Sequence, residues 1–173
     1  MRKHRLPVLW SSKPRAVFGF TLIELLVTLA ILSILAAAAL PYAELTVRRD
    51  RELELKRSLR EVRSAIDAFH EDWVAGRISR SGNNASDDGY PRKLQVLVDG
   101  VDTGRAGSSK RRYLRSIPAN PFAYSATTPV VEQWRLRGYQ DEADALSWNG
   151  KDVYDIHTLS DAKAIDGTSY KDW

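Results

Sequence analysis

The stretch that decides the fold of this chain reads Gly19-Phe20-Thr21-Leu22-Ile23-Glu24. It opens an apolar run, residues 20–40, in which Glu24 is the one formal charge. A helix rises about 1.5 Å per residue, so a run of this length spans roughly the 30 Å hydrocarbon core of a bilayer. The run keeps no polar stripe of the kind that a soluble helix turns toward water. It therefore predicts a membrane-spanning helix.

The carboxylate of Glu24 is expensive in such a helix. On membrane insertion scales, a charged side chain at mid-span costs about 2.5–3.5 kcal/mol. A carboxylate kept at this cost needs a partner that is a hydrogen-bond donor or a cation. A signal anchor, or a secretory signal cleaved at the four alanines 36–39, is the alternative interpretation. Neither interpretation explains why Glu24 lies inside the apolar run or why a Gly19-Phe20 pair stands at its start.

The first nineteen residues hold most of the positive charge. The chain has a net charge of +4, but residues 1–19 contain five lysines and arginines and no acid, so the remainder carries −1. The positive net charge of the whole chain therefore gives little indication of a nucleic-acid partner. Lysine and arginine beside a membrane span stay in the cytoplasm, which places the C-terminal part outside. The chain has no cysteine, so its C-terminal end needs packing or a metal instead of a disulfide.

Residues 19–24 resemble the type III signal of type IV pilins and type II secretion pseudopilins. In that family a prepilin peptidase cuts after the glycine and the new N-terminal phenylalanine is methylated. The resemblance therefore implies cleavage after Gly19 and N-methylation of Phe20. It also implies that Glu24 pairs with the N-terminal amine of a neighbouring subunit during filament assembly. Pro41 matches the family's proline near the lower end of the apolar run.

We expect four parts along the chain. Residues 1–19 form a prepilin leader that is removed, and residues 20–41 form a transmembrane helix. Residues 42–76 form the extracytoplasmic half of the same helix, and residues 77–173 form a globular domain. The expected fold class is α+β, with a long N-terminal helix, membrane-spanning in its first half, packed on a small antiparallel sheet as in pilins.

An apolar stripe follows the membrane segment. Between Leu55 and Trp73 its residues recur at steps of four and three, which keeps them on one helix face. The stripe comprises Leu45, Glu52, Leu55, Leu59, Val62, Ile66, Phe69 and Trp73. Charged residues between them form a solvent-exposed face of the helix. The pattern predicts one helix over about residues 20–75 that ends near Gly76.

The C-terminal half carries weaker patterns. Residues 77–88 are expected to form a surface loop, residues 90–97 a short helix or turn opened by Pro91, and residues 98–109 a loose segment. Alternation of large and polar residues predicts strands over 132–139 and 153–159. Tyr113-Leu114 and the Pro-x-x-Pro-aromatic segment 118–122 resemble the corresponding stretch of the secretion pseudopilins.

The C-terminal loop is rich in oxygen donors. Ca²⁺ takes about 6–8 oxygen ligands in flexible geometry. Major pseudopilins have a calcium site in this loop, after a Tyr-Asp-Ile-like strand that residues 154–156 resemble. The tentative calcium ligands are Ser160, Asp161, Asp166 and Asp172. The alternative is an acidic, hydrogen-bonded loop pinned by Tyr170 and Trp173.

A basic run could bind DNA, which would fit a DNA-uptake pilin. It consists of Arg105, Lys110, Arg111, Arg112 and Arg115, with Tyr113 among them. The alternative is a solvated face. We expect no enzyme, because His4, His70 and His157 cannot be tied by spacing to a nucleophile or to paired acids.

These patterns and the resemblance predict a structural subunit of a pseudopilus that drives type II protein secretion. The expected location is the bacterial inner membrane, with one pass, a cytoplasmic N-terminus and a periplasmic C-terminal domain, and the filament after extraction. Expected partners are further copies, other pseudopilins, the prepilin peptidase and the inner-membrane assembly platform, with no nucleic acid. The alternative is a minor type IV pilin that binds DNA in uptake.

Overall fold

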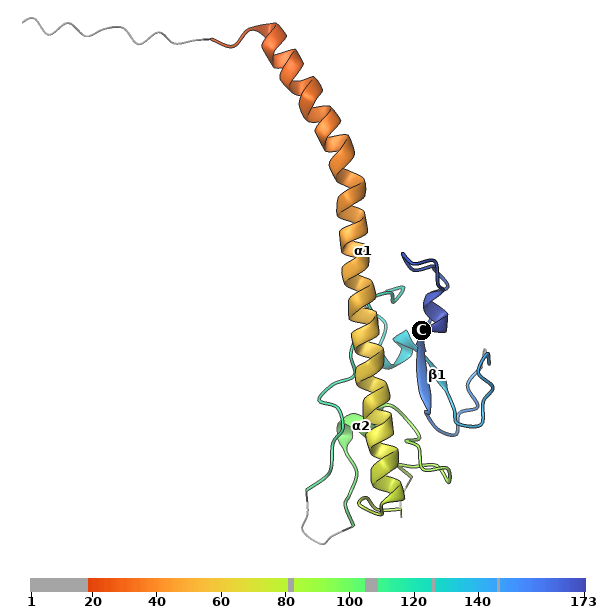
Figure 1. Cartoon of the computed structure of the whole chain (residues 1–173). Coiled ribbons are helices and arrows are strands. Elements are labelled where there is room, and N and C mark those ends of the chain that lie inside the picture. The colour runs from red at the N-terminus through yellow and green to blue at the C-terminus, as the bar shows by residue number, and fades with distance from the viewer. Residues whose placement is uncertain (1–18, 81–82, 105–108, 126, 146) are drawn as a thin grey trace, which may run out of the picture. The chain divides into compact units, whose positions relative to one another are not determined.

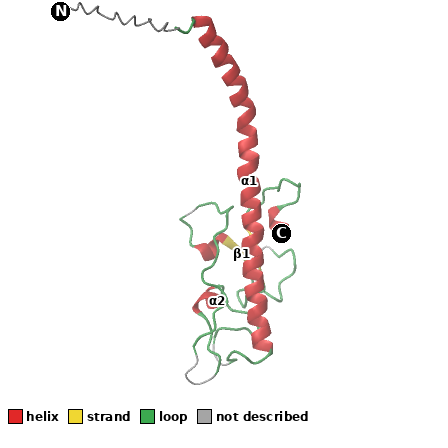
Figure 2. Cartoon of the chain, turned by 60° about the vertical axis from the view of Figure 1, so that its left-hand side comes forward, coloured by secondary structure: helices red, strands yellow, loops and turns green. Residues whose placement is uncertain are grey.

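The computed structural model describes residues 19–80, 83–104, 109–125, 127–145 and 147–173, so the predicted leader, but for Gly19, lies outside the described residues. The chain divides into two compact units, Met1–Ala43 and Glu44–Trp173. The elements are α1 (Leu22–Val74), α2 (Gln95–Asp99), the 3₁₀ turn η1 (Val130–Gln133), β1 (Trp134–Arg137), β2 (Asp155–Thr158) and the 3₁₀ turn η2 (Tyr170–Asp172) (Figures 1 and 2). The predicted α+β class, a long N-terminal helix and a small antiparallel sheet, is confirmed.

The outer part of α1 supplies one wall of the hydrophobic core. The stripe is confirmed over its middle, where the side chains of Leu55, Leu59, Val62, Ile66 and Phe69 are all at most 3% exposed. They pack with residues of the second half, among them Leu94, Leu97, Trp134, Val153, Ile156 and Tyr170. The apolar face of the helix therefore organises the packing of the Glu44–Trp173 unit.

The two ends of the predicted stripe differ from its middle. Leu45 is 53% exposed, because the core begins further along α1. Trp73 is only partly buried, with Arg80 over its ring at 4.6 Å from the centroid. A Cβ on Gly89 would come within 2.5 Å of the Trp73 ring, so only glycine allows this close approach.

The helix ends through Gly76, as predicted. Gly76 has a φ of +65°, in the left-handed region that glycine adopts without strain. Its N–H donates to the carbonyl of Trp73 (3.1 Å), and the N–H of Arg77 donates to the carbonyl of Asp72 (2.8 Å). This pair of bonds is a Schellman motif, which satisfies carbonyls that the last turn leaves free.

The carboxylate of Asp72 holds the end of α1 to the segment around residue 112. Its side chain is 1% exposed, pairs with Arg77 (2.5 Å) and Arg111, and accepts a hydrogen bond from the Tyr113 hydroxyl (2.8 Å). Burial raises the pKa of Asp72, but Arg77, Tyr113 and Arg111 outweigh it and hold the pKa below its usual value. The negative end of the helix disfavours a carboxylate here, so the two guanidinium groups are needed.

β1 and β2 form a two-stranded antiparallel sheet, in a register that pairs Trp134 with Thr158 and Arg137 with Asp155. Both strands are shorter than predicted. The strand predicted over residues 132–139 begins only at Trp134, because residues 130–133 form the 3₁₀ turn η1 after Pro129. Two strands alone are marginally stable in water, so the sheet depends on its packing against α1.

Asp155 connects the sheet to the helix. Its carboxylate pairs with Arg63 of α1 (2.7 Å) and Arg137 of β1 (3.0 Å), and Arg63 also donates to the carbonyl of Ile156 (3.1 Å). Burial by itself raises the pKa of Asp155, but the neighbouring His157 ring and the Arg63 guanidinium outweigh it and lower the pKa to about 2.

The short helix predicted around residues 90–97 is present, but its start and the looseness of the following segment were predicted wrongly. The short helix α2 begins at Gln95 and not at Pro91, because Pro91 is held extended by a bridge to Ala85 and by the N–H of Val153 (2.8 Å). The segment 98–109 is not loose at its start, since Val101 is 2% exposed and exchanges both backbone hydrogen bonds with Arg111.

Truncating Phe69 to alanine should destabilise the domain strongly. Loss of a buried aromatic side chain costs about 3–5 kcal/mol, a large share of a total stability of about 5–15 kcal/mol. Thermal unfolding of the full chain in detergent, followed by circular dichroism, should show a sharply lower melting temperature. Arg57→Ala, on the exposed face of the same helix, should leave it nearly unchanged, and equal effects would mean that the helix phase is misassigned.

Replacing Asp155 with asparagine should remove part of the acid sensitivity of folding. The folded-state pKa of about 2 lies below the unfolded value of about 3.9. The pairing therefore stabilises the fold above about pH 4, and this contribution, at most about 2.6 kcal/mol, is lost as the pH falls toward 2. Urea unfolding at steps from pH 7 to pH 2 should give a flatter profile for Asp155→Asn than for wild type. The exposed control Asp161→Asn should keep the wild-type slope, and identical slopes for all three proteins would contradict the assignment.

Candidate functional site

The predicted cleavage site directly precedes α1. Gly19 and Phe20 lie before the first helical residue, and Phe20 is 84% exposed. A Cβ built on Gly19 would meet no atom of the described residues within 4 Å. The described part of the chain therefore does not restrict the size of the side chain at this position.

Thr21 caps the helix, which the sequence reading missed. Its hydroxyl oxygen accepts a hydrogen bond from the backbone N–H of Glu24 at 3.3 Å, and its carbonyl accepts one from Leu25 at 3.1 Å. Thr-x-x-Glu before an apolar run is the sequence signature of a capping box, and it could have identified Thr21. Glu24 thus stands in the first turn of α1, where the positive end of the helix favours a carboxylate.

The helix end compensates only part of the cost of Glu24. A carboxylate in the first turn gains about 0.3–1 kcal/mol when exposed and up to about 2 kcal/mol when partly buried. The cost at mid-span is about 2.5–3.5 kcal/mol. The helix end therefore offsets part of the mid-span cost but supplies no cation, so the partner expected for Glu24 stays a prediction.

The residues that follow Glu24 expose their apolar side chains in this chain. By length and composition, α1 could cross a membrane, and its apolar window is not covered by any described part of the chain. The exposed large side chains include Leu22, Ile23, Leu25, Leu26, Val27, Leu29, Ile31, Leu32, Ile34 and Leu35. Such a surface needs a lipid or protein environment.

The four tentative calcium ligands are spread along the C-terminal loop. The Asp166 carboxylate accepts hydrogen bonds from the N–H (2.9 Å) and the hydroxyl (2.6 Å) of Thr168, which lower its pKa. Asp161 and Asp172 are exposed, and Ser160 accepts a bond from the N–H of residue 162. Within the described ranges no three acids or histidines form a group that could hold a metal ion. Calcium binding stays a prediction.

Two side chains of α1 clamp the same loop. Glu52 accepts hydrogen bonds from the buried Tyr170 hydroxyl (2.7 Å) and from the N–H of Ile165 (2.8 Å). Arg48 donates to the Tyr170 hydroxyl (3.3 Å) and to the carbonyl of Lys163. The contacts of the alternative, a hydrogen-bonded loop pinned by Tyr170 and Trp173, are present, since Trp173 packs edge-on against Tyr170 and its indole N–H donates to the Thr168 hydroxyl.

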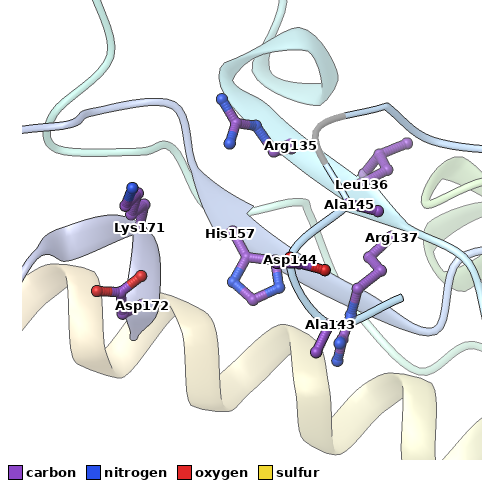
Figure 3. A pocket seen from close by; sticks show the side chains of 9 residues that line it. All are labelled: Arg135, Leu136, Arg137, Ala143, Asp144, Ala145, His157, Lys171 and Asp172. Carbon is purple, nitrogen blue, oxygen red and sulfur yellow. The ribbon is translucent and has the colours of Figure 1, made fainter. Parts of the chain in front are cut away.

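A small pocket of about 110 Å³ lies beside the sheet (Figure 3). It is lined by Arg135, Leu136, Arg137, Ala143, Asp144, Ala145, His157, Lys171 and Asp172. The His157 ring is directed into it, with Nε2 3.2 Å from the Asp155 carboxylate. None of the lining residues is a serine, threonine or cysteine, and two of them, Arg137 and His157, pair with Asp155 outside the lining.

The basic run divides into two parts. Arg105 lies outside the described residues. Arg111 is engaged by Asp72 and covers the ring of Tyr113 at 5.8 Å from the centroid. Lys110, Arg112 and Arg115 are exposed and line an open groove.

Comparison with known proteins agrees with the N-terminal pattern. The family described as "Prokaryotic N-terminal methylation motif" matches residues 14–40. A curated relative, "Fimbrial protein Q" from Moraxella bovis, is 25% identical over 155 residues, which cover 90% of this chain and 90% of that protein. No solved structure matches.

The motif match contains Gly19, Phe20 and Glu24, and the second similarity extends over nearly the whole chain. One similarity is to an N-terminal methylation motif and the other to a protein named as fimbrial, and the structure has the long helix and small antiparallel sheet that the resemblance implies. The methylation motif, the fimbrial relative and the α+β architecture together support the similarity of this chain to type IV pilin-like proteins.

Proposed function

We propose that this chain is a filament subunit of a type II secretion pseudopilus. The observation that carries the proposal is the placement of Glu24 one turn into an apolar helix, directly after an exposed Gly19-Phe20 pair. A prepilin peptidase would cut after Gly19, and Phe20 would become a methylated N-terminus. The chain would sit in the inner membrane with its C-terminal domain in the periplasm, and leave the membrane on assembly with further copies, other pseudopilins and the assembly platform.

The paired charge explains how assembly follows processing. Residues 20–47 contain no lysine or arginine, so after cleavage the cation nearest to Glu24 in the sequence of a lone subunit is its own Phe20 amine. Both groups lie within the first turn and a half of the helix, which makes that contact awkward. The amine of a neighbour shifted along the filament axis can approach Glu24 from outside. Because the amine exists only after cleavage, the same cut would permit polymerisation.

A type IV pilus is the second candidate. The similarity to "Fimbrial protein Q" over 90% of both chains favours it. The resemblances at Tyr113-Leu114, at residues 118–122 and at residues 154–156 favour the secretion pseudopilus. Deletion of the gene separates the two: loss of secreted enzymes with intact surface pili supports the pseudopilus, and loss of pili with intact secretion supports the pilus.

Substitution of Gly19 should block processing. No described residue restricts the size of the side chain at this position, so we attribute a processing defect to the peptidase. For Gly19→Val we expect the uncut precursor, whereas the wild-type protein extracted from membranes should have an intact mass that begins at a methylated Phe20. A mature wild-type chain that begins after residue 39 would instead identify a secretory signal.

Glu24→Ala should leave membrane insertion and cleavage intact but weaken incorporation into the filament. The substitution removes an uncompensated charge from the lone subunit, so insertion should not suffer. Crosslinking of neighbouring subunits through cysteines introduced into this cysteine-free chain measures incorporation. Thr28→Ala, whose hydroxyl only bonds back to the carbonyl of Leu25, is the control in the same helix. Normal crosslinking and secretion by Glu24→Ala would show that the carboxylate does not set subunit register.

A further inference from the structure

An open groove of about 940 Å³ lies along the segment that follows α2. It is lined by Val98, Asp99, Lys110, Arg112, Tyr113, Leu114 and Arg115. Among the residues that the structure describes, no ion pair within 4.0 Å is formed by Lys110, Arg112 or Arg115. Asp99 is the one acid in the lining, and its carboxylate accepts a hydrogen bond from Gln95 at 3.0 Å. The groove therefore carries a surplus of positive charge.

A second segment of the same unit has the opposite charge. Residues 138–150 contain three acids and no lysine or arginine. The Asp141 carboxylate shapes this loop, because it accepts hydrogen bonds from the N–H groups of Gly138 (2.8 Å) and Asn149 (3.2 Å). Glu142 and Asp144 remain exposed. The loop therefore exposes two carboxylates, of which that of Asp144 also lines the small pocket together with Arg135, Arg137 and Lys171.

The basic and acidic segments lie to either side of α1 in the view of Figure 1. Two complementary patches on different sides of one subunit cannot pair within that subunit. Between copies they make a head-to-tail contact, which propagates into an open filament when it does not close into a ring. We propose that the groove at Lys110, Arg112 and Arg115 receives Glu142 and Asp144 of a second copy, an inference that rests on the proposed function of the chain as a filament subunit.

A nucleic acid fits this groove less well than an acidic loop. DNA-binding proteins that bind through phosphates typically make about 6–10 such contacts, whereas this groove has three free cations and an acid. The Tyr113 ring is not free to stack on a base, because Arg111 covers it and its hydroxyl bonds to Asp72. The chain from residue 20 onward carries a net charge of −1, which does not attract a polyanion from a distance.

Charge reversal with rescue tests the contact in the full-length, membrane-extracted protein. Ser116→Cys and Ser147→Cys place thiols beside the groove and in the acidic loop, where both positions are exposed. We expect a crosslinked ladder between these two positions. Reversal of the groove by Arg112→Glu with Arg115→Glu should lower the crosslinked fraction at least about tenfold, because like charges across an interface are strongly disfavoured.

Rescue makes the test specific to this pair of surfaces. Glu142→Lys with Asp144→Lys should lower crosslinking equally, and the chain that carries all four reversals should recover it. The control Arg57→Glu with Arg60→Glu, on the exposed face of α1, should crosslink like wild type. Higher salt should weaken the wild-type ladder, since exposed charge pairs are screened within about 10 Å at 0.1 M.

Crosslinks in the apolar segment distinguish a missing groove contact from a missing filament. Cysteines at Thr28 and Ser33 of the apolar segment report assembly without involving the groove. A ladder at these positions with none between Ser116→Cys and Ser147→Cys, or wild-type crosslinking by either reversed pair, overturns the contact alone. Absence of every ladder in the wild-type background overturns both. Duplex DNA binding that the groove reversal abolishes, with unchanged assembly, would assign the groove to a nucleic acid and also overturn the contact.

Discussion

The contact of α1 with the two-stranded sheet is the interaction on which the Glu44–Trp173 unit depends. Two strands cannot bury enough apolar surface to hold themselves together in water. The helix provides that surface through side chains such as Val62 and Phe69, and Arg63 from the neighbouring face fixes the sheet through the Asp155 carboxylate. The same carboxylate also binds Arg137 of the adjacent strand, so one buried charge ties together three elements.

Much of the architecture could be predicted from local patterns. The steps of four and three residues after Leu55 set the buried face of α1, and Gly76 marked its end because a left-handed residue closes a helix. The patterns could not show that Asp72 is buried, since its partners Arg111 and Tyr113 lie about forty residues away in the sequence and are brought to it by tertiary packing alone. The extended conformation of Pro91 has the same origin, because Val153 donates to its carbonyl.

The functional residues likewise divide into those with a local sequence signal and those that only the folded structure brings together. Gly19, Phe20 and Glu24 could be proposed as site residues from the sequence because their spacing is local and the cost of a carboxylate in an apolar helix is large. The Thr21 cap was also local and was missed, although Thr-x-x-Glu is its signature. The groove and the acidic loop could not be foreseen as partners. Sequence shows runs of charge, but only the structure shows that Arg111 is neutralised internally while Arg112 and Arg115 stay exposed.

The clamp on the C-terminal loop fastens the chain without a covalent bond. Glu52 and Arg48 hold Tyr170 and its neighbours across more than one hundred residues, the task that a disulfide performs in many small extracytoplasmic domains. A fastening of this kind forms as soon as the helix and loop meet, so folding would need no oxidant and would be indifferent to the redox state of its surroundings.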